Sequence, residues 1–501
     1  MDADPPAVES VTSRVARGTG WVVAWRIVSR NLGLLSTLVL VRLLRPEDFG
    51  LVALATGFIN TVDALSTIGV QDALVRETSP ERDMYDTAFG LNILRGIITA
   101  AIILAIAWPV ADFFSEPRLV GVMLALSLSM LLSAFANIGI IDFRRDFEFH
   151  KEFNLFVIAR VSGIVATIAV ALIWRSYWAL VFGLLTNRMA GLVLSYTMSA
   201  YRPRISFHSW RRLIGFSFWM WLQTMLMQVK ERGDSIVIGR ILGTSQFGVF
   251  AIGSEFGALP VTEVVEPLSR TLFSGFALLH RSAESPTRLY LGSIETAIAL
   301  ILPAGIGISM VADPMVRFVL GAQWLSAVPV IQIIAIACPL SVFGTFSATF
   351  LTAGGQPRAT FLVSSVSGVI RIPLMIALVY AWGLPGAAVG VGIAMLIDQG
   401  LFLWRTMHHL TVTIRDLLLC TWRAVTASFV MVICLHLLGM AWTPGSEGPG
   451  WTNYRDLAVR CGLGAAIYAV SLLVTWVVAG RPDGIERQLF TLARGRLWPG
   501  R

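Results

Sequence analysis

Arginine side chains inside apolar segments are the residues whose chemistry sets this sequence apart. The segment 19–43 is long and apolar enough to cross a bilayer, yet it carries Arg26 and Arg30 one helical turn apart. Gly33 and Thr37 continue the same helical face. A cation buried in a membrane is costly, so it normally faces a partner or a water-filled cavity. The pattern therefore predicts a helix that forms one wall of a polar cavity.

Other arginines lie deep in later apolar segments, and their number points to an anionic ligand. Together with Arg26 and Arg30 they make five deep arginines, which exceed what a few structural ion pairs require, so the surplus implies that an anion enters the cavity. The planar guanidinium group suits the oxygens of a phosphate. We predict that the substrate-binding residues are Arg26, Arg30, Arg95, Arg160 and Arg371.

Acidic residues in the same segments offer a second chemistry. Asp63 is expected to hold Arg26 or Arg30 in place, and Lys230 lies on a polar face of its segment. Asp63, Glu255 and Asp398 are candidate ion or proton sites, with a counter-ion role as the alternative for each. Arg188 is expected near the cytoplasmic end of its helix. No catalytic residue and no metal-ligand spacing is identified.

Composition places these residues in a polytopic membrane protein. The 501 residues are 55% hydrophobic and 14% charged, whereas soluble domains carry about 25% charged residues. The net charge of +8 is spread over many loops, which excludes a polynucleotide-binding domain. The four cysteines stand singly in apolar segments, so we predict core residues rather than disulfides or metal ligands. Because no nucleotide-binding loop is present, we expect no cofactor, with Na⁺ or H⁺ considered as coupling ions.

Fourteen apolar segments have the length of a membrane-spanning helix. They cover 19–43, 50–71, 88–108, 119–140, 153–174, 177–199, 213–239, 247–269, 294–312, 328–352, 360–381, 385–405, 417–440 and 457–480. Lys and Arg gather in the N-terminal tail, in alternate links and after Gly480, which places both termini in the cytoplasm. The acidic start of the chain is unlike a cleavable signal peptide, so we expect the first helix to be retained.

An internal repeat divides the chain into two similar parts. A shift of 198 residues aligns Trp21 with Trp219, and RLLRPEDFGLVA, from Arg42, with RILGTSQFGVFA, from Arg240. Because each part holds six helices, the two lobes are related by an axis along the membrane normal, with two extra helices at the C-terminus. The predicted parts are a cytoplasmic tail (1–18), an N-lobe (19–199), a cytoplasmic linker (200–212), a C-lobe (213–405), two further helices (417–480) and a cytoplasmic tail (481–501).

The stretch from Trp21 to Arg76, with SRNLGLLSTLVLVRLLRPEDFG at its start, resembles the polysaccharide-transporter branch of the multidrug/oligosaccharidyl-lipid/polysaccharide superfamily. GAQW at Gly321–Trp324 looks like the same branch. The resemblance implies two six-helix lobes around a central cavity that opens alternately to the two sides of the inner membrane. It also implies a cargo of undecaprenyl-diphosphate-linked oligosaccharide, delivered to the periplasmic leaflet for exopolysaccharide, capsule or lipopolysaccharide synthesis.

Relatives that flip the peptidoglycan precursor carry a Ser-Arg-x-Leu-Gly pattern, which Ser29, Arg30 and Gly33 match here. The resemblance thereby adds Ser29 as a supporting residue and places Arg30 near the pyrophosphate. Those relatives have an arginine where this chain has Ser36, which disfavours the peptidoglycan precursor as cargo. The implied partners are the lipid-linked oligosaccharide and membrane lipids, with a polysaccharide polymerase and a chain-length regulator considered, and no nucleic acid.

Two other functions were weighed against this one. A cation-coupled multidrug exporter of the same superfamily would favour a carboxylate-dominated cavity, whereas arginines dominate here. A membrane glycan polymerase or glycosyltransferase would need a sizeable periplasmic loop, and the longest predicted one, 441–456, is short and glycine-rich.

Overall fold

The structure is a computed structural model that describes residues 11–66, 74, 81–145, 148–210, 218–282, 285–445 and 450–480. Over those ranges the chain forms helices and links, as predicted for an all-α protein. Contacts divide it into two compact units, Met1–Gln228 and Val229–Arg501, here called the N-terminal and C-terminal units. The side chains of Arg26 and Lys230 lie outside the described residues.

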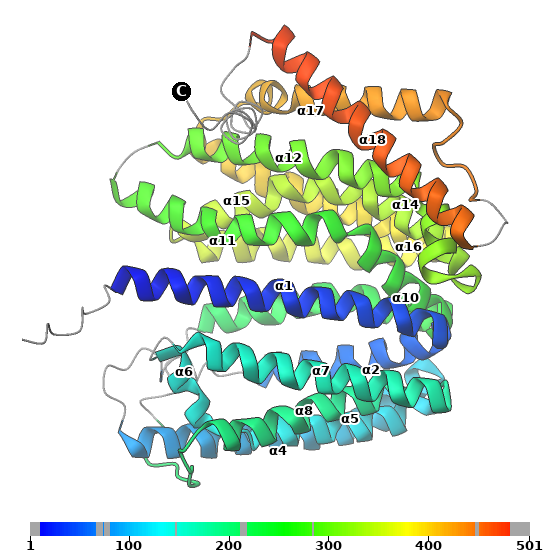
Figure 1. The fold of residues 1–501 in the computed structure, drawn as a ribbon. Coiled ribbons are helices and arrows are strands. Elements are labelled where there is room, and N and C mark those ends of the chain that lie inside the picture. Colours follow the sequence, from blue (N-terminus) through cyan, green and yellow to red (C-terminus); the bar gives the residue numbers. More distant parts are fainter. Residues whose placement is uncertain are drawn as a thin grey trace, which may run out of the picture. The chain divides into compact units, whose positions relative to one another are not determined.

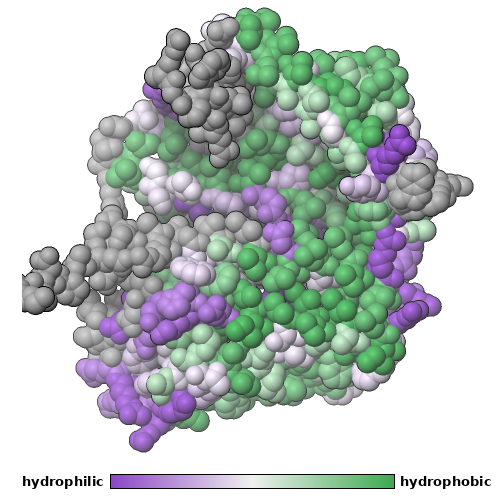
Figure 2. Space-filling model, viewed as in Figure 1, coloured by the Kyte–Doolittle hydropathy of each residue, from purple (hydrophilic) through white to green (hydrophobic). Residues whose placement is uncertain are grey.

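The N-terminal unit contains six long helices that run alongside one another (Figure 1). Its elements are α1 (Val11–Leu43), α2 (Pro46–Ser66), α4 (Arg82–Phe114), α5 (Arg118–Ala134), η1 (Ile138–Ile141), α6 (Asp142–Arg145), α7 (Phe149–Trp174) and α8 (Trp178–Met198). The segment η1–α6 is bent by 69° from α5. Figure 2 shows hydrophobic residues over the middle of these helices and hydrophilic residues toward the ends. The exposed side chains of α4 include Leu94, Ile98 and Ile102.

Small residues let α7 and α8 approach closely, which positions the polar side chains of α8. A Cβ atom on Gly163 of α7 would lie 2.8 Å from Cβ of Asn187 on α8, so only glycine fits at that position. Close contact through small residues is a common way for helices to pack in a membrane. It places Asn187, and Arg188 beside it in sequence, next to α7.

The C-terminal unit is also built from helices. Its elements are α10 (Phe218–Gly257), α11 (Leu259–Ser282), α12 (Thr287–Met310), α13 (Ala312–Met315), η2 (Val316–Leu320), η3 (Ala322–Ala327), α14 (Val328–Ala337), η4 (Cys338–Leu340), α15 (Ser341–Ala353), α16 (Pro357–Leu410), α17 (Ile414–Leu437) and α18 (Gly450–Val478). The predicted segment 328–352 is divided at η4, where Pro339 cannot continue the α-helical hydrogen bonding.

Glycines break the two longest helices. In α10 the backbone at Gly243 has φ 81° and ψ 172°, a conformation that is essentially restricted to glycine, so two helices meet there. The 198-residue shift pairs Gly243 with Arg45, which lies in the link between α1 and α2, so the break falls where the repeat predicts it. In α16 two helices meet at Gly383 (φ 62°), between the predicted segments 360–381 and 385–405.

Ten helices of the described residues are long and apolar enough to cross a membrane, or eleven if α5 and the bent η1–α6 segment form one span. This count is lower than the fourteen predicted segments. The count covers the described residues only. It takes α10 and α16, each of which contains a break, as one span apiece, and it does not include α1. The protein is therefore an all-helical, multi-pass membrane protein.

The two C-terminal helices pack on α12 through buried polar contacts. Arg423 of α17 forms an ion pair with Glu295 of α12, and both side chains are largely buried. Tyr468 of α18 donates a hydrogen bond of 2.6 Å to the backbone oxygen of Ala299. These contacts make α17 and α18 an integral part of the C-terminal unit.

Candidate functional site

A cavity of about 270 Å³ lies inside the N-terminal unit, among α2, α4, α5, α7 and α8. One side of its lining is apolar and includes Leu155 and Phe156 of α7. Its polar lining comes from four helices, α2, α4, α5 and α8, and comprises Asp63, Arg95, Thr99, Ser133, Asn187 and Arg188. Such a mixture of apolar walls and a few convergent polar groups is typical of a ligand-binding cavity.

Arg95 and Asp63 form the charged pair of this cavity. Nη1 of Arg95 donates to Oδ1 of Asp63 over 3.1 Å, and the side chains are 25% and 41% exposed. One turn further along α4, Thr99 donates a hydrogen bond to Ser66, so α2 and α4 are joined twice. The structure thus gives Asp63 an arginine partner on α4, which the sequence did not predict. The predicted pairing with Arg26 or Arg30 stays a prediction.

Two further arginines lie in or beside the cavity, and no carboxylate of the described residues pairs with them. Among the described residues, neither Arg160 of α7 nor Arg188 of α8 makes an ion pair or a hydrogen bond. Arg188 lines the cavity, and Arg160 follows the lining residue Ala159. Both are exposed. The region therefore holds more positive than negative charge.

Arg160 reaches α1 at the glycine of the Ser-Arg-x-Leu-Gly pattern. A Cβ atom on Gly33 would lie 3.0 Å from Nη2 of Arg160, so the missing side chain makes room for the guanidinium group. Ser29 and Arg30, one turn before Gly33 on α1, are half-buried. The structure thereby brings the face of α1 that carries Arg30 together with Arg160, as an arginine-lined cavity requires.

The predicted site residues of the C-terminal unit lie in a different charge environment. The guanidinium group of Arg371 binds the carboxylate of Asp234, with Nε at 2.9 Å from Oδ1, so its charge is matched by the protein. Ser367 donates a short hydrogen bond to Asp398 within α16. Glu255 is exposed on α10. Of the predicted arginines whose side chains are described, Arg371 is thus paired with a carboxylate, whereas Arg160 makes no ion pair with the described residues.

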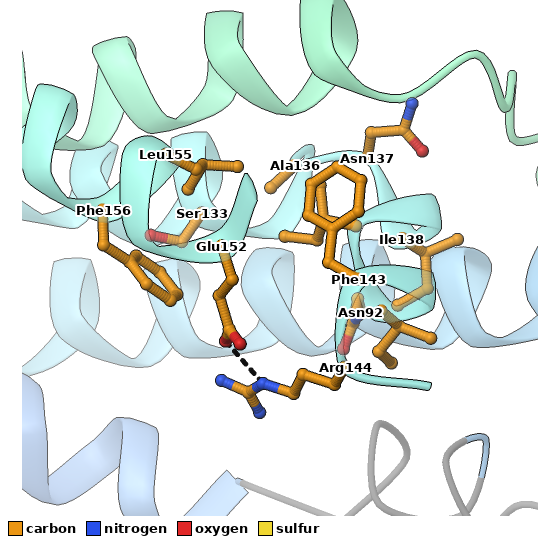
Figure 3. Close-up of a pocket in the computed structure, with 12 residues that line it drawn as sticks. Asn92, Ser133, Ala136, Asn137, Ile138, Phe143, Arg144, Glu152, Leu155 and Phe156 are labelled. Atoms are coloured by element: carbon orange, nitrogen blue, oxygen red, sulfur yellow. Dashed lines mark hydrogen bonds and ion pairs between the residues drawn. The ribbon is translucent and has the colours of Figure 1, made fainter. Parts of the chain in front are cut away.

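A second cavity, of about 200 Å³, adjoins the first one (Figure 3). Glu152 of α7 and Arg144 of α6 point toward one another across it and form an ion pair of 2.5 Å. Asn92 of α4 lines the same cavity, and its amide makes no hydrogen bond with the described part of the chain. Asn137 is fully buried and structural, since its side chain binds the backbone of Gly139 and Tyr201.

Sequence reasoning missed several of these groups. Arg188 was expected near a helix end, but it lies at the middle of α8 and lines the cavity, so that expectation is wrong. Its position near the centre of the apolar segment 177–199 was the signal that could have identified it. The expectation of core positions for the cysteines holds for Cys338, which is buried, and fails for Cys461, which is exposed. The described residues contain no cluster of three or more His, Cys, Asp or Glu side chains that could hold a metal ion.

The sequence profile of one known family matches residues 39–329, which is more than half of the chain. That family is described as polysaccharide biosynthesis protein. The chain belongs to it. The resemblance to the polysaccharide-transporter branch is therefore confirmed by a match that includes α2 through η3.

The alignments of this polysaccharide biosynthesis family member with curated relatives cover most of its length. The chain is 23% identical over 497 residues to the succinoglycan biosynthesis transport protein ExoT of Rhizobium meliloti, which covers 98% of this chain and 97% of that protein. It is 22% identical to the lipopolysaccharide biosynthesis protein WzxC of Escherichia coli, over 78% of this chain and 79% of the relative. The names of both relatives refer to polysaccharide biosynthesis, and that of ExoT refers to transport.

Solved structures share the fold of this family member. The lipid II flippase MurJ in an inward closed conformation has a TM-score of 0.72 at 13% identity, over 92% of this chain and 100% of the other. An inward-facing multidrug resistance MATE family transporter of the MOP superfamily has a TM-score of 0.60 at 14% identity, over 76% and 94% of the two chains. The chain therefore shares its fold with these two structures.

Proposed function

We propose that the protein is a flippase that carries undecaprenyl-diphosphate-linked oligosaccharide units across the bacterial inner membrane. The cavity opens first to the cytoplasm and then to the periplasm, with both termini in the cytoplasm and fourteen spanning helices in two lobes and a C-terminal pair. The oligosaccharide then serves exopolysaccharide, capsule or lipopolysaccharide synthesis. The names of the relatives, succinoglycan transport and lipopolysaccharide biosynthesis, support this assignment.

The observation that carries the proposal is the excess of guanidinium groups in the N-terminal unit. Arg95, Arg160 and Arg188 lie in or beside one cavity whose lining contains a single carboxylate, that of Asp63. A cation-coupled drug exporter would need the opposite balance, because its cargo is positively charged. A diphosphate carries two or more negative charges and offers oxygens to several guanidinium groups at once, so it fits this balance.

The test is transport of the lipid-linked oligosaccharide in proteoliposomes that contain the purified full-length protein. Arg188→Ala is the informative variant, because Arg188 has no partner in the described residues and its removal leaves no carboxylate unpaired. Loss of a charge-assisted hydrogen bond predicts a transport rate lower by about tenfold or more. Arg188→Lys keeps the charge but loses the planar guanidinium group, so its transport rate should lie between those of the wild type and Arg188→Ala.

A matched control is Arg118→Ala, since Arg118 lies in the same unit and is already bound to Glu116 at 2.7 Å. Its transport rate should equal that of the wild type. Equal rates for Arg188→Ala and the wild type would remove Arg188 from the phosphate site. Efflux of cationic drugs without oligosaccharide transport would contradict the proposed function itself.

A further inference from the structure

A third cavity, of about 190 Å³, adjoins the two already described and is lined mainly by aromatic rings. Trp21 and Trp25 of α1 face the beginning of α7. The ring centroids of Trp21 and Phe153 are 5.1 Å apart, and those of Trp25 and Phe156 are 5.3 Å apart. Glu152 and Arg144, the ion pair of the second cavity, also line this one.

The three cavities are neighbours within the N-terminal unit, since they share lining residues. Phe156 lines all three, and Leu155 lines both the first and the second. The chemistry of the walls changes from the first cavity to the third. It begins with the guanidinium groups of Arg95 and Arg188, passes Asn92 and the Arg144–Glu152 pair, and ends at the two tryptophans.

This order corresponds to the order of groups in a diphosphate-linked sugar. The diphosphate is bonded directly to the first sugar, and the next sugar follows. One face of a sugar ring carries C–H groups that pack against an aromatic ring, while its hydroxyl groups bind planar charged or amide side chains. Trp25 and Phe156 offer aromatic rings for the C–H face of the sugar. The side chains that can bind its hydroxyl groups are Asn92, Arg144 and Glu152.

We propose that the second and third cavities together form a sugar-binding site that holds the first sugars of the cargo. The sugar stacks on Trp25 and Trp21, and its hydroxyl groups bind Glu152, Arg144 and Asn92. The inference rests on the proposed function, because it takes the diphosphate at Arg95 and Arg188 as the anchor. The isoprenoid chain is a poorer occupant, since it would remove water from Arg144 and Glu152 without replacing their hydrogen bonds.

The alternative role for the tryptophans is to anchor the helix at the membrane surface, where such residues are common. The geometry favours the cavity role for Trp25, which is half-buried and packs against Phe156 inside the unit. Trp108 of α4 is 56% exposed and lies outside all three cavities, so it serves as the matched control tryptophan.

Equilibrium binding to the full-length protein in detergent tests the site. The probes are undecaprenyl diphosphate and undecaprenyl diphosphate that carries one glucose, galactose, mannose or N-acetylglucosamine. The wild type should bind at least one sugar-bearing lipid more tightly than the bare diphosphate by about fivefold to tenfold. Trp25→Ala and Glu152→Gln should abolish that preference and leave the affinity for the bare lipid unchanged, and Trp108→Ala should keep the preference.

The outcomes separate this inference from the proposed function. Equal affinity of the wild type for all five lipids, or an unchanged preference in both Trp25→Ala and Glu152→Gln, would overturn the sugar-binding site. Weaker binding of every lipid by Trp25→Ala would indicate that Trp25 holds the isoprenoid chain, and this result would also overturn the sugar-binding site. If Arg188→Ala loses all binding and the wild type prefers a sugar-bearing lipid, the result supports both the phosphate site of the proposed function and the sugar-binding site. Unchanged binding in Arg188→Ala would count against the phosphate site alone. Glu152→Gln keeps the shape of the side chain, so the test stands even if Trp25→Ala fails to fold.

Discussion

If the cargo binds Arg95 as proposed, its phosphate competes with Asp63 for the same guanidinium group. The Arg95–Asp63 pair is partly exposed, and such pairs contribute about 1 kcal/mol or less, so a dianion can displace the carboxylate. A carboxylate that returns to Arg95 when the cargo leaves would keep the empty cavity from trapping other anions. The pair therefore sets a balance between binding and release.

Replacing Asp63 by Asn tests that balance. Asp63→Asn removes the competing charge and keeps a hydrogen-bond acceptor near Arg95, so the affinity for undecaprenyl diphosphate should rise by about fivefold. Transport should slow because release becomes harder. Binding of the radiolabelled lipid and initial transport rates measure the two effects. Weaker binding in Asp63→Asn would indicate that Asp63 orients Arg95 for the cargo rather than competing with it.

At the residue scale, the sequence identified the kinds of group but not their partners. Arginines in apolar segments are visible in the sequence because their cost in a membrane makes them rare. Which carboxylate faces which arginine depends on helix rotation and packing, so the Arg95–Asp63 and Arg371–Asp234 pairs emerged only from the structure. For the same reason the position of Arg188 was not predicted, since it depends on the close approach of α7 and α8 at Gly163.

At the scale of the elements, a glycine allows α10 to turn where the equivalent helices α1 and α2 are separated by a link. Gly243 adopts a conformation that other residues reach only with strain of about 1–3 kcal/mol. Gly243→Ala should therefore lower the apparent melting temperature of the protein in detergent. Gly292→Ala is the control, because Gly292 lies within α12 with open space around its Cβ position, and alanine there should be neutral or stabilising by up to about 1 kcal/mol.

Thermal unfolding followed by light scattering or intrinsic fluorescence compares the two variants. Equal melting temperatures for Gly243→Ala and Gly292→Ala would contradict the assignment of Gly243 as a required break. The position of this break was predictable from the repeat. The division of 328–352 at Pro339 was not, because the segment stays apolar across the interruption.

The segment after α8, predicted as a cytoplasmic linker, makes specific contacts with the N-terminal unit. Tyr201 donates a hydrogen bond of 2.7 Å to Asp86 at the beginning of α4, and the backbone N–H of Arg204 donates to the same carboxylate oxygen. Burial, together with the bond to Asp86, raises the pKa of Tyr201, so the hydroxyl stays protonated and remains a donor. The predicted linker 200–212 is thus held on the N-terminal unit over its described part, which hydropathy could not reveal.

At the scale of the whole molecule, the sequence established the class of protein and the family because both depend on features spread over the chain. Apolar length, charge bias and the repeat predicted an all-helical membrane protein, and the match over residues 39–329 established the family. The substrate-binding groups depend on a few side chains instead. The arrangement of charges within the N-terminal unit is therefore the part of the account that most needs a functional measurement.

The most direct measurement is the location of lipid-linked oligosaccharide in cells that lack the gene and carry either the wild type or Arg160→Ala/Arg188→Ala. Both arginines lack a partner among the described residues, so the double variant leaves no carboxylate unpaired and should reach the membrane in normal amounts. A probe restricted to the periplasm should label the lipid-linked oligosaccharide in wild-type cells. In the double variant we predict that the lipid accumulates unlabelled in the cytoplasmic leaflet and that surface polymer falls by about tenfold or more. Normal labelling and normal polymer in cells with the double variant would contradict the claim that these guanidinium groups bind the diphosphate.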